Sequence, residues 1–514
     1  MANGENKGLS ILYRTEDWLA VWLGFLIIAL VLAGLTVKPP KFKWTTEGEF
    51  AGLVKENTPV VEALAKLSEQ KGEAGAATAL GALRQAMAKG ERKAVGDAAK
   101  KVDEALKPVK DKDFKKSVGE ITKKLSSNSG ALLEKIFAAE NLLWSLYLLI
   151  GFGALALVGL VLLGQSAGQF IVGFPVVFII AWVSQFIAGN FSINELGLEY
   201  VLWCLALGLV VSNVVGLPEW LKPAVQTEFY IKTGLVILGT GILFGEIVQA
   251  GIYGIVQAAL VIAVIWYFCY WLSHKKMGID QDFSALLSSA VSICGVSAAI
   301  ATAGAIKADP KKMSYVTSIT LICAIPMLVL QPAIAKWVGM PDVVAGAWLG
   351  GTLDTSGSVV AAGALISETA MKTGVIVKMS QNVFIGFAAF FLAIWWTYKE
   401  CRDLPESERP GAIEIWNRFP KFVLGFMISS LVFSFLLSPD TIKVVKGPLG
   451  GLRTWWFALA FTCIGLETHF GDLAKMGGGR PAVAFVIAQS VNIIWTLILA
   501  YLIFGGVLFP PPKM

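Results

Sequence analysis

One carboxylate is notable because it lies inside a segment apolar enough to cross a lipid bilayer. Asp354 occurs in the stretch G-G-T-L-D-T-S-G of residues 350–357, among small and hydroxylated residues. An ionisable group in hydrocarbon costs several kcal/mol, about 3 on insertion scales, and marks a path for ions or substrates. We therefore predict that Asp354 couples transport to a proton or Na⁺. The alternative is a structural acid held by neighbouring hydroxyl groups.

A second polar segment, residues 284–306, carries serines around a cysteine and a glycine. Glycine can interrupt a helix here, and freed N–H groups at a positive helix end form a site for an anion or a polar substrate. The alternative for this segment is helix packing through small residues. Lys378 lies on a later span, and its alternative role is to extend its ammonium group to the membrane surface. The predicted substrate-binding residues are Ser292, Cys294, Gly295, Ser297, Thr352, Thr355, Ser356, Ser358, Lys378 and Gln381.

Another acid, Glu467, ends an apolar segment beside Cys463 and Gly465, and we predict a second ion-coupling residue there. An interfacial or helix-capping role is the alternative. The sequence has two histidines, no H-E-x-x-H pattern and no nucleotide-binding loop, and its cysteines form neither a disulfide framework nor a metal-type spacing. We therefore expect no enzyme, no metal and no cofactor beyond a coupling H⁺ or Na⁺.

Composition places the chain in a membrane. Its 514 residues are 55% hydrophobic and 16% charged, with a mean hydropathy of +0.66, which is too apolar for a soluble protein of this length. The net charge of +6 equals the excess within residues 38–137, which hold 20 Lys/Arg and 14 Asp/Glu. The positive charge therefore does not indicate nucleic acid as a partner.

The apolar segments predict an all-α membrane protein with about 13 transmembrane helices. Residues 1–37 contain a predicted membrane anchor, and residues 138–514 a polytopic transporter domain. Residues 38–137 show apolar positions at helical spacing and predict a hydrophilic helical domain, either a spacer or a partner-binding module. Most basic loops fall on one side, which places the N-terminus in the cytoplasm and residues 38–137 outside.

An internal repeat is visible in the sequence. The pattern F-G-E-I-x-x-x-G at residues 244–251 returns as F-G-D-L-x-x-x-G at residues 470–477, and residues 200–218 correspond to residues 422–439. The copies lie an odd number of predicted spans apart, so they run in opposite directions across the membrane. Inverted repeats with broken helices are typical of secondary transporters. Chance similarity between apolar, glycine-rich segments is the alternative.

Several longer motifs carry a family resemblance: S-I-C-G-V-S-A at 292–298, G-G-T-L-D-T-S-G-S-V-V-A-A-G at 350–363, Lys378 with Met379, G-L-V-I-L-G at 234–239 and I-G-L-E-T-H at 464–469. With them the chain resembles the YeiH-type family, which carries the label sulfate exporter, over about residues 168–508. The resemblance implies a fold distantly similar to sodium/proton antiporters and bile-acid symporters. It also implies crossing, discontinuous helices around Cys294 and Gly295 and around Cys463 and Gly465.

The chain departs from the family pattern at the site itself. Family members commonly show His where this chain has Asp354, Gln where it has Ser358, and a basic residue where it has Gln381. Each change removes a positive or hydrogen-bond-donating group. A doubly charged anion beside an ionised Asp354 therefore requires an accompanying cation or proton.

These features together predict a secondary transporter of the cell inner membrane. We expect it to move a small anion, sulfate or sulfonate-like, or a polar organic solute by alternating access, with H⁺ or Na⁺ coupling. A cation/proton antiporter is one alternative, and a membrane sensor or scaffold with a partner-binding outer domain is another. The expected partners are membrane lipid and the substrate; a homodimer and a partner for residues 38–137 stay open.

Overall fold

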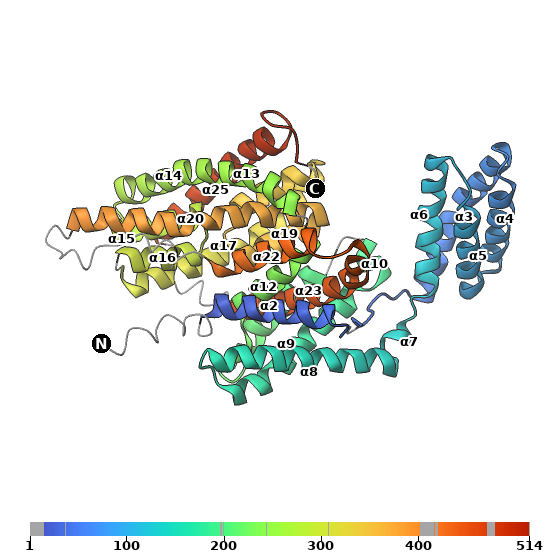
Figure 1. The fold of residues 1–514 in the computed structure, drawn as a ribbon, viewed down its shortest axis with the longest axis horizontal. Coiled ribbons are helices and arrows are strands. Elements are labelled where there is room, and N and C mark those ends of the chain that lie inside the picture. The colour runs from blue at the N-terminus through green and yellow to red at the C-terminus, as the bar shows by residue number, and fades with distance from the viewer. Residues whose placement is uncertain are drawn as a thin grey trace. The chain divides into compact units, whose positions relative to one another are not determined.

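The protein is built from helices, as the computed structural model shows for residues 15–35, 38–195, 198, 200–242, 244–306, 308–400, 416, 420–469 and 479–512 (Figure 1). Within those ranges there is no strand, and the only extended pairing is an isolated bridge between Trp44 and Asn190. The predicted all-α class is confirmed. The chain divides into two compact units: unit 1 comprises Met1–Thr36, Gly151–Ala181 and Cys204–Met514, and unit 2 comprises Val37–Ile150 and Trp182–Trp203.

Seven helical segments of the described chain are long and apolar enough to cross a membrane, which confirms a multispanning membrane protein. Four shorter apolar helices accompany them, at Tyr200–Val215, Ser297–Ile306, Ser356–Ile366 and Lys421–Phe435. The predicted total of 13 spans stays a prediction. The seven segments are Ala139–Leu162 (α8), Ala167–Ala188 (α9), Phe244–Lys276 (α13 to η5), Tyr315–Trp337 (within α17, Pro310–Trp337), Glu368–Trp396 (within α20, Glu368–Glu400), Pro439–Glu467 (α23) and Arg480–Phe504 (α25).

Unit 2 contains a bundle of amphipathic helices that lie side by side (Figure 1). Its first helix begins at a capping box, in which Thr46 Oγ1 accepts from the Glu49 N–H at 3.2 Å and the Thr46 N–H donates to Glu49 Oε2 at 2.7 Å. The helices of this unit are α3 (Glu47–Gln70), α4 (Ala74–Lys89), α5 (Arg92–Ala105), α6 (Lys112–Ser129), α7 (Leu133–Ile136) and the short α10 (Phe191–Glu195).

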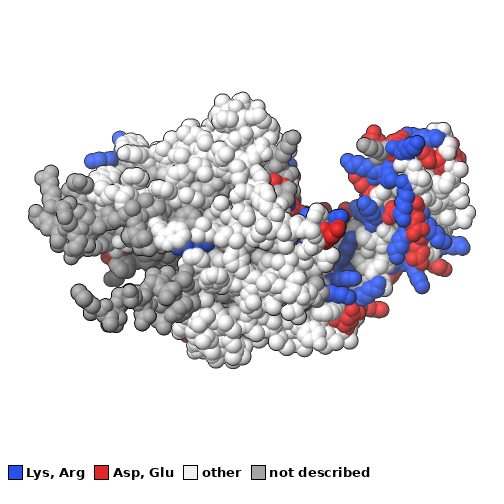
Figure 2. All heavy atoms as spheres, in the orientation of Figure 1, with Lys and Arg blue, Asp and Glu red and all other residues white. Residues whose placement is uncertain are grey.

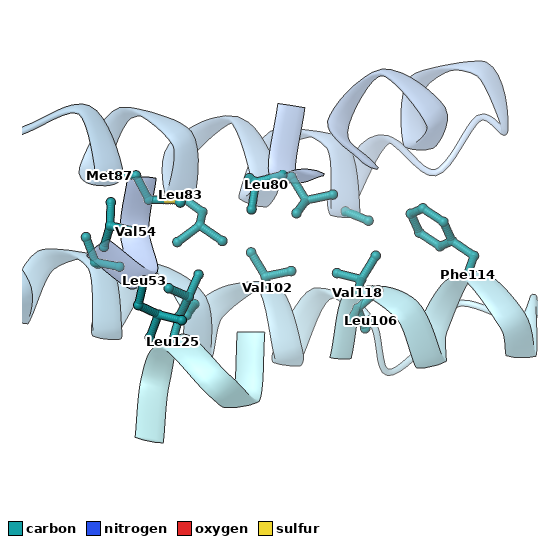
Figure 3. Packing of buried hydrophobic residues seen from close by; sticks show 14 of the residues in the cluster. Leu53, Val54, Leu80, Leu83, Met87, Val102, Leu106, Phe114, Val118 and Leu125 are labelled. Carbon is teal, nitrogen blue, oxygen red and sulfur yellow. The ribbon is translucent and has the colours of Figure 1, made fainter. Parts of the chain in front are cut away.

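The bundle has a hydrophobic core of its own. Leu80, Leu83 and Met87 of α4 recur at helical spacing and face Val102 of α5 and Leu125 of α6 (Figure 3). Figure 2 shows Lys, Arg, Asp and Glu side chains gathered over unit 2, whereas the described atoms on the visible face of unit 1 are mostly uncharged. The sequence contrast between residues 38–137 and the rest is therefore a contrast between a water-facing bundle and an apolar body.

In unit 1, helix α12 (Thr227–Leu238) is almost entirely buried between α2 (Glu16–Leu32), α22 (Lys421–Phe435) and α23. Lys232 in the middle of α12 forms ion pairs with Glu16 at 2.6 Å and Asp17 at 2.9 Å, at the start of α2. A lysine with little access to water is stabilised by ion pairing. The acids that precede the predicted anchor therefore attach it to the rest of unit 1.

The two predicted repeats contact each other reciprocally. A Cβ at Gly239, in the 3-10 turn η3 (Gly239–Gly241), would lie 2.4 Å from Phe426 O of α22. A Cβ at Gly465 of α23 would lie 2.5 Å from Leu205 O of α11 (Tyr200–Val210). In the sequence alignment of the repeats, Gly239 corresponds to Gly465 and α22 to α11. In each copy, the glycine at this equivalent position allows close contact with a helix of the other copy.

Hydrogen bonds also join the two repeats in both directions. Ser212 Oγ donates to Thr468 O at 3.0 Å, and Ser430 Oγ donates to Ile242 O at 2.5 Å. Ile242 and Thr468 occupy equivalent positions, each three residues after the paired glycine and each with an extended backbone. The two accepting carbonyls are therefore equivalent, although the serines that donate to them are not at equivalent positions of the repeat. Residues 470–477, the second copy of the F-G-D-L pattern, lie outside the described residues.

Candidate functional site

Two interrupted helices meet at the predicted site. The first consists of α15 (Gln281–Ser292) and α16 (Ser297–Ile306), and the second of α18 (Asp342–Thr352) and α19 (Ser356–Ile366). The Gly295 N–H donates to Asp354 O at 2.8 Å, which joins one break to the other. A Cβ at Gly295 would lie 1.9 Å from Thr320 Cγ2. The same Cβ would lie 3.1 Å from Asp354 Cβ, so glycine lets the first break pack closely against both α17 and the second break.

The helix break implied around Cys294 and Gly295 is found, whereas the one implied around Cys463 and Gly465 is not. Helix α23 continues through both residues to Glu467. Gly465 serves instead as the close contact to α11, because a helical glycine lets two backbones approach. The second break lies at residues 353–355, so Asp354 itself occupies an interruption.

Asp354 is a buried acid with an unsatisfied oxygen. Its side chain is 2% exposed, and in the described part of the chain no donor reaches Oδ2. It immediately precedes Thr355, the N-cap of α19, whose Oγ1 accepts from the Ser358 N–H at 3.1 Å. The positive end of α19 lowers the cost of a negative charge here. Lys378 interacts with Asp354 electrostatically, but no contact ion pair joins these two described residues.

Lys378 and Gln381 on α20 bind the C-terminal carbonyls of the first interrupted helix. Lys378 Nζ donates to Ile293 O at 2.7 Å and to Gln381 Oε1 at 2.9 Å, and Gln381 Nε2 donates to Ser292 O at 2.8 Å. Carbonyls at a helix end have no partner within the helix, so they need such donors when buried. Lys378 is only 2% exposed, so it does not extend to the membrane surface.

Helix α25 supplies two further donors that the sequence analysis did not select. Gln489 Nε2 donates to Thr352 O at 2.7 Å, and Asn492 Nδ2 donates to Val291 O at 3.1 Å. Thr496 Oγ1 donates to Asn492 Oδ1 at 2.9 Å. The signal was available in the sequence, because residues 489, 492 and 496 repeat at helical spacing along one face of an apolar span.

Several of the predicted hydroxyl groups are already engaged. Ser292 Oγ donates to Ser288 O at 2.7 Å and Thr352 Oγ1 to Trp348 O at 2.8 Å, each within its own helix. Ser356 Oγ accepts from Asn382 Nδ2 at 3.3 Å. Cys294 is buried in the first break and Ser297 is half-buried at the start of α16. Ser292 and Thr352 therefore support the helix ends in this conformation.

Glu467 lies beside the second interrupted helix. It lines a small cavity of about 20 Å³ together with Thr355 and Ser358 of α19. That volume holds about one water molecule. The other lining residues come from α12, α17, α19 and the C-terminal end of α23: Thr227, Glu228, Leu321, Ala324, Ile325, Leu328, Gly357, Ile464 and Thr468. The structure thus brings the two predicted ion-coupling acids to the same end of α19.

The arrangement suits a monovalent ion better than a resident metal. Among the described residues, no three His, Cys, Asp or Glu side chains are grouped to hold a metal ion. A single carboxylate oxygen without a donor, as in Asp354, can bind a proton or accept a Na⁺ as an oxygen ligand. A small anion would be attracted by the N-terminal ends of α16 and α19 and by Lys378.

Comparison with known proteins gives a family. The family described as conserved hypothetical protein 698 matches residues 172–484. A UPF0324 membrane protein of Rhodopirellula baltica is 43% identical over 349 residues, which cover 66% of this chain and 64% of that protein. A UPF0324 membrane protein of Nitratidesulfovibrio vulgaris is 39% identical over 375 residues, with 71% and 64% covered. The bundle of α3 to α6 lies outside the family match.

A more distant relative carries a location in its name. The UPF0324 inner membrane protein YeiH of Escherichia coli is 26% identical over 350 residues, which cover 66% of this chain and 94% of that protein. The first relatives are matched over 64% of their own length. None of these three names states a substrate, so the sulfate exporter label is not confirmed. No solved structure matches the chain.

Proposed function

The chain belongs to the conserved hypothetical protein 698 family of YeiH-type membrane proteins, and from this premise we propose that it is a secondary active transporter. Its substrate is a small oxyanion of the sulfate or sulfonate type, or a polar organic solute, and H⁺ or Na⁺ is the coupling ion. The relatives share membrane location in their names. The transport assignment comes from the site.

The observation that carries the proposal is the unsatisfied Oδ2 of Asp354 at the contact between two interrupted helices. A buried carboxylate without a donor is costly, because its charge has lost its water and gained no hydrogen bond. Binding a proton or Na⁺ removes that cost. The same event lowers the repulsion between Asp354 and an incoming anion, so the coupling ion and the anion favour each other's binding.

In this proposal transport proceeds by alternating access, and the small size of the cavity beside α19 supports it. A space of about 20 Å³ accommodates water and is too small for an oxyanion, so this cavity must widen before an oxyanion can pass through it. Substrate enters when α19 separates from the facing segments of α12, α17 or α23. The carbonyls of Ser292 and Ile293 stay bound to α20 throughout, so α15 moves together with α20.

The N-terminus lies in the cytoplasm and the bundle of unit 2 lies outside the inner membrane in this proposal. The support is the excess of basic residues in the loops of one side and the inner-membrane name of the YeiH relatives. No catalytic step and no bound cofactor are part of the proposed function.

Flux into proteoliposomes tests the proposal. The purified chain is reconstituted, and uptake of labelled sulfate and of a labelled sulfonate is measured with and without imposed pH and Na⁺ gradients. We expect uptake of at least one of these anions to exceed that of empty liposomes and to rise with one of the two gradients. Uptake equal to that of empty liposomes for every oxyanion and solute, under both gradients, would contradict oxyanion transport.

Cation/proton antiport is the second candidate, and the same oxygen favours it. Asp354 Oδ2 can bind Na⁺ or H⁺ in turn, as exchange requires, without any anion. A pH-sensitive dye inside the proteoliposomes separates the two functions. Proton movement triggered by Na⁺ or K⁺ alone, and unchanged by sulfate or sulfonates, would favour antiport over anion transport.

A further inference from the structure

A second, unassigned pocket lies in unit 2, and it is lined by lysines. Its volume is about 440 Å³, and its cationic groups are Lys43 of the segment before α3 and Lys123 and Lys124 of α6. Four polar or charged residues and three apolar residues complete the lining. These are Ser127, Asn128, Asn194 and Glu195, with Ala188, Gly189 and Phe191.

The walls of this lysine pocket are held in place by backbone pairing. The Trp44 N–H donates to Gly189 O at 2.9 Å and the Phe191 N–H donates to Trp44 O at 2.9 Å. A Cβ at Gly189 would lie 1.9 Å from Phe42 O, so a glycine is required for this approach. The Lys124 ammonium lies over the Phe191 ring, 5.5 Å from its centre. The lysines are therefore presented by a built framework.

Positive charge exceeds negative charge among the lining residues, with three ammonium groups against the single carboxylate of Glu195. Lys124 forms an ion pair with Glu195 at 2.7 Å, and Lys43 Nζ donates to Ser127 Oγ at 3.0 Å. The Lys123 ammonium has no hydrogen-bond or ion-pair partner among the described residues. Partial burial lowers the pKa of Lys43, an effect that Glu195 opposes and Lys124 adds to. A bound anion would neutralise the excess positive charge of the lining.

We propose that the lysine pocket binds an oxyanion of the phosphate, sulfate or sulfonate type. Ammonium groups from two chain segments surround the anion, and the Asn194 amide is available to hydrogen-bond its oxygens. The oxyanion is either free in solution or the headgroup of an anionic lipid. This site is separate from the transport site and does not depend on the proposed function.

The neighbouring aromatic residues make a lipid headgroup one of the two sources to test. The Trp44 and Phe186 rings stack at 5.2 Å, and Trp182 stacks on Phe186 at 5.9 Å. Phe137 packs on both Trp182 and Phe186 while remaining 51% exposed. Aromatic groups of this kind gather at the level of lipid headgroups.

Binding to the full-length protein in detergent tests the site in two arms. One arm measures equilibrium binding of labelled sulfate and inorganic phosphate. The other measures retention of phosphatidylglycerol against phosphatidylcholine by native mass spectrometry. Lys123→Ala is compared with Lys116→Ala, which removes an exposed lysine of the same helix outside the pocket. Lys43→Ala is the second variant, and unchanged melting temperatures confirm that the variants fold.

We expect Lys123→Ala and Lys43→Ala each to weaken binding about tenfold, since each removes a charge-assisted contact, and Lys116→Ala to leave it unchanged. A loss in the soluble-anion arm identifies a free oxyanion, and a loss confined to phosphatidylglycerol identifies a lipid headgroup. Both results support the pocket. Binding that is absent in both arms, or equally strong in the Lys43 and Lys123 variants and wild type, would overturn it, whatever the proteoliposome flux shows.

Discussion

At the scale of single residues, the two buried ionisable side chains of the candidate site differ in their hydrogen bonding. Lys378 donates to Ile293 O and to Gln381 Oε1, whereas Asp354 Oδ2 receives no hydrogen bond from any described residue. Lys378 is thus part of the framework that holds α15. Asp354 is the group to which the proposed function assigns the coupling ion, because its Oδ2 has no donor among the described residues.

A second acid, Glu49, gives the helical bundle of unit 2 a measurable pH dependence. Burial alone would raise its pKa, but hydrogen bonds from Ser192, Thr46 and Asn190 together lower the pKa from 4.5 to about 2. Because the folded-state pKa is the lower one, its stabilising contribution is full above pH 4.5 and is lost as the pH falls toward 2. Glu49→Gln should therefore lower the melting temperature at neutral pH. The difference in melting temperature from wild type should become smaller as the pH falls.

Thermal unfolding of the full-length protein, followed by tryptophan fluorescence between neutral pH and pH 3, measures this difference. Glu56→Gln, at an exposed position of the same helix, is the matched control and should match wild type at every pH. A Glu49→Gln effect that stays constant across the range would contradict the assignment.

The sequence predicted part of this site for a definite physical reason. An acid in an apolar stretch is rare, so Asp354 is conspicuous, and the serine-rich segment with Gly295 contains the first break. Gln489 and Asn492 were missed because buried amides occur in many helices without a site. Their role appears only when the interrupted helices expose carbonyls that need donors.

At the scale of elements, glycine has two structural roles, a helix break and a close helix contact, and the sequence alone does not distinguish them. Gly295 lies in a break between helices, whereas Gly465 lies inside a continuous helix and admits the backbone of α11. Both occur beside a cysteine in apolar, small-residue surroundings. The reciprocal positions of Gly239 and Gly465 follow from the duplication, which the sequence pattern did predict.

Replacing Gly465 with alanine tests the reciprocal contact. The new Cβ would lie 2.5 Å from Leu205 O and 2.9 Å from Gly208 Cα, and neither backbone atom can turn aside as a side chain would. We expect a loss of about 1–3 kcal/mol of folding free energy, read as a lower melting temperature in detergent. Gly239→Ala should behave alike, because its Cβ would meet Phe426 O.

Gly450→Ala is the control on the same helix, since nothing lies within 4 Å of its Cβ position. Alanine is the better helix former, so this variant should keep or raise the melting temperature. Equal melting temperatures for Gly465→Ala and Gly450→Ala would contradict close backbone packing between the repeats.

At the scale of the whole molecule, the helical bundle of unit 2 is an insertion whose ends meet. The Thr45 N–H donates to Ala131 O at 2.9 Å, so the chain leaves and re-enters at neighbouring points. The bundle has its own hydrophobic core and lies outside the family match. Composition predicted its helices and its water-facing character. The packing of these helices could not be predicted, because each has one apolar face and the sequence does not show which other helix covers that face.

Excision of the bundle separates the transporter from the sensor alternative. Residues 47–130 are replaced with a short Gly/Ser linker, which the closeness of Thr45 and Ala131 permits. We expect the shortened chain to retain substrate flux in proteoliposomes at a rate within about tenfold of wild type, since the site residues all lie in unit 1. Complete loss of flux by a shortened protein that still folds would favour the sensor or scaffold.

The central claim is that Asp354 holds the coupling ion, and its most direct test is flux through Asp354→Asn in proteoliposomes under imposed pH and Na⁺ gradients. Asparagine keeps the shape and removes the titratable charge. Wild type should transport faster with the coupling gradient, and the variant should lose that acceleration while still folding and binding substrate. Transport by Asp354→Asn with the same ion dependence as wild type would contradict the account.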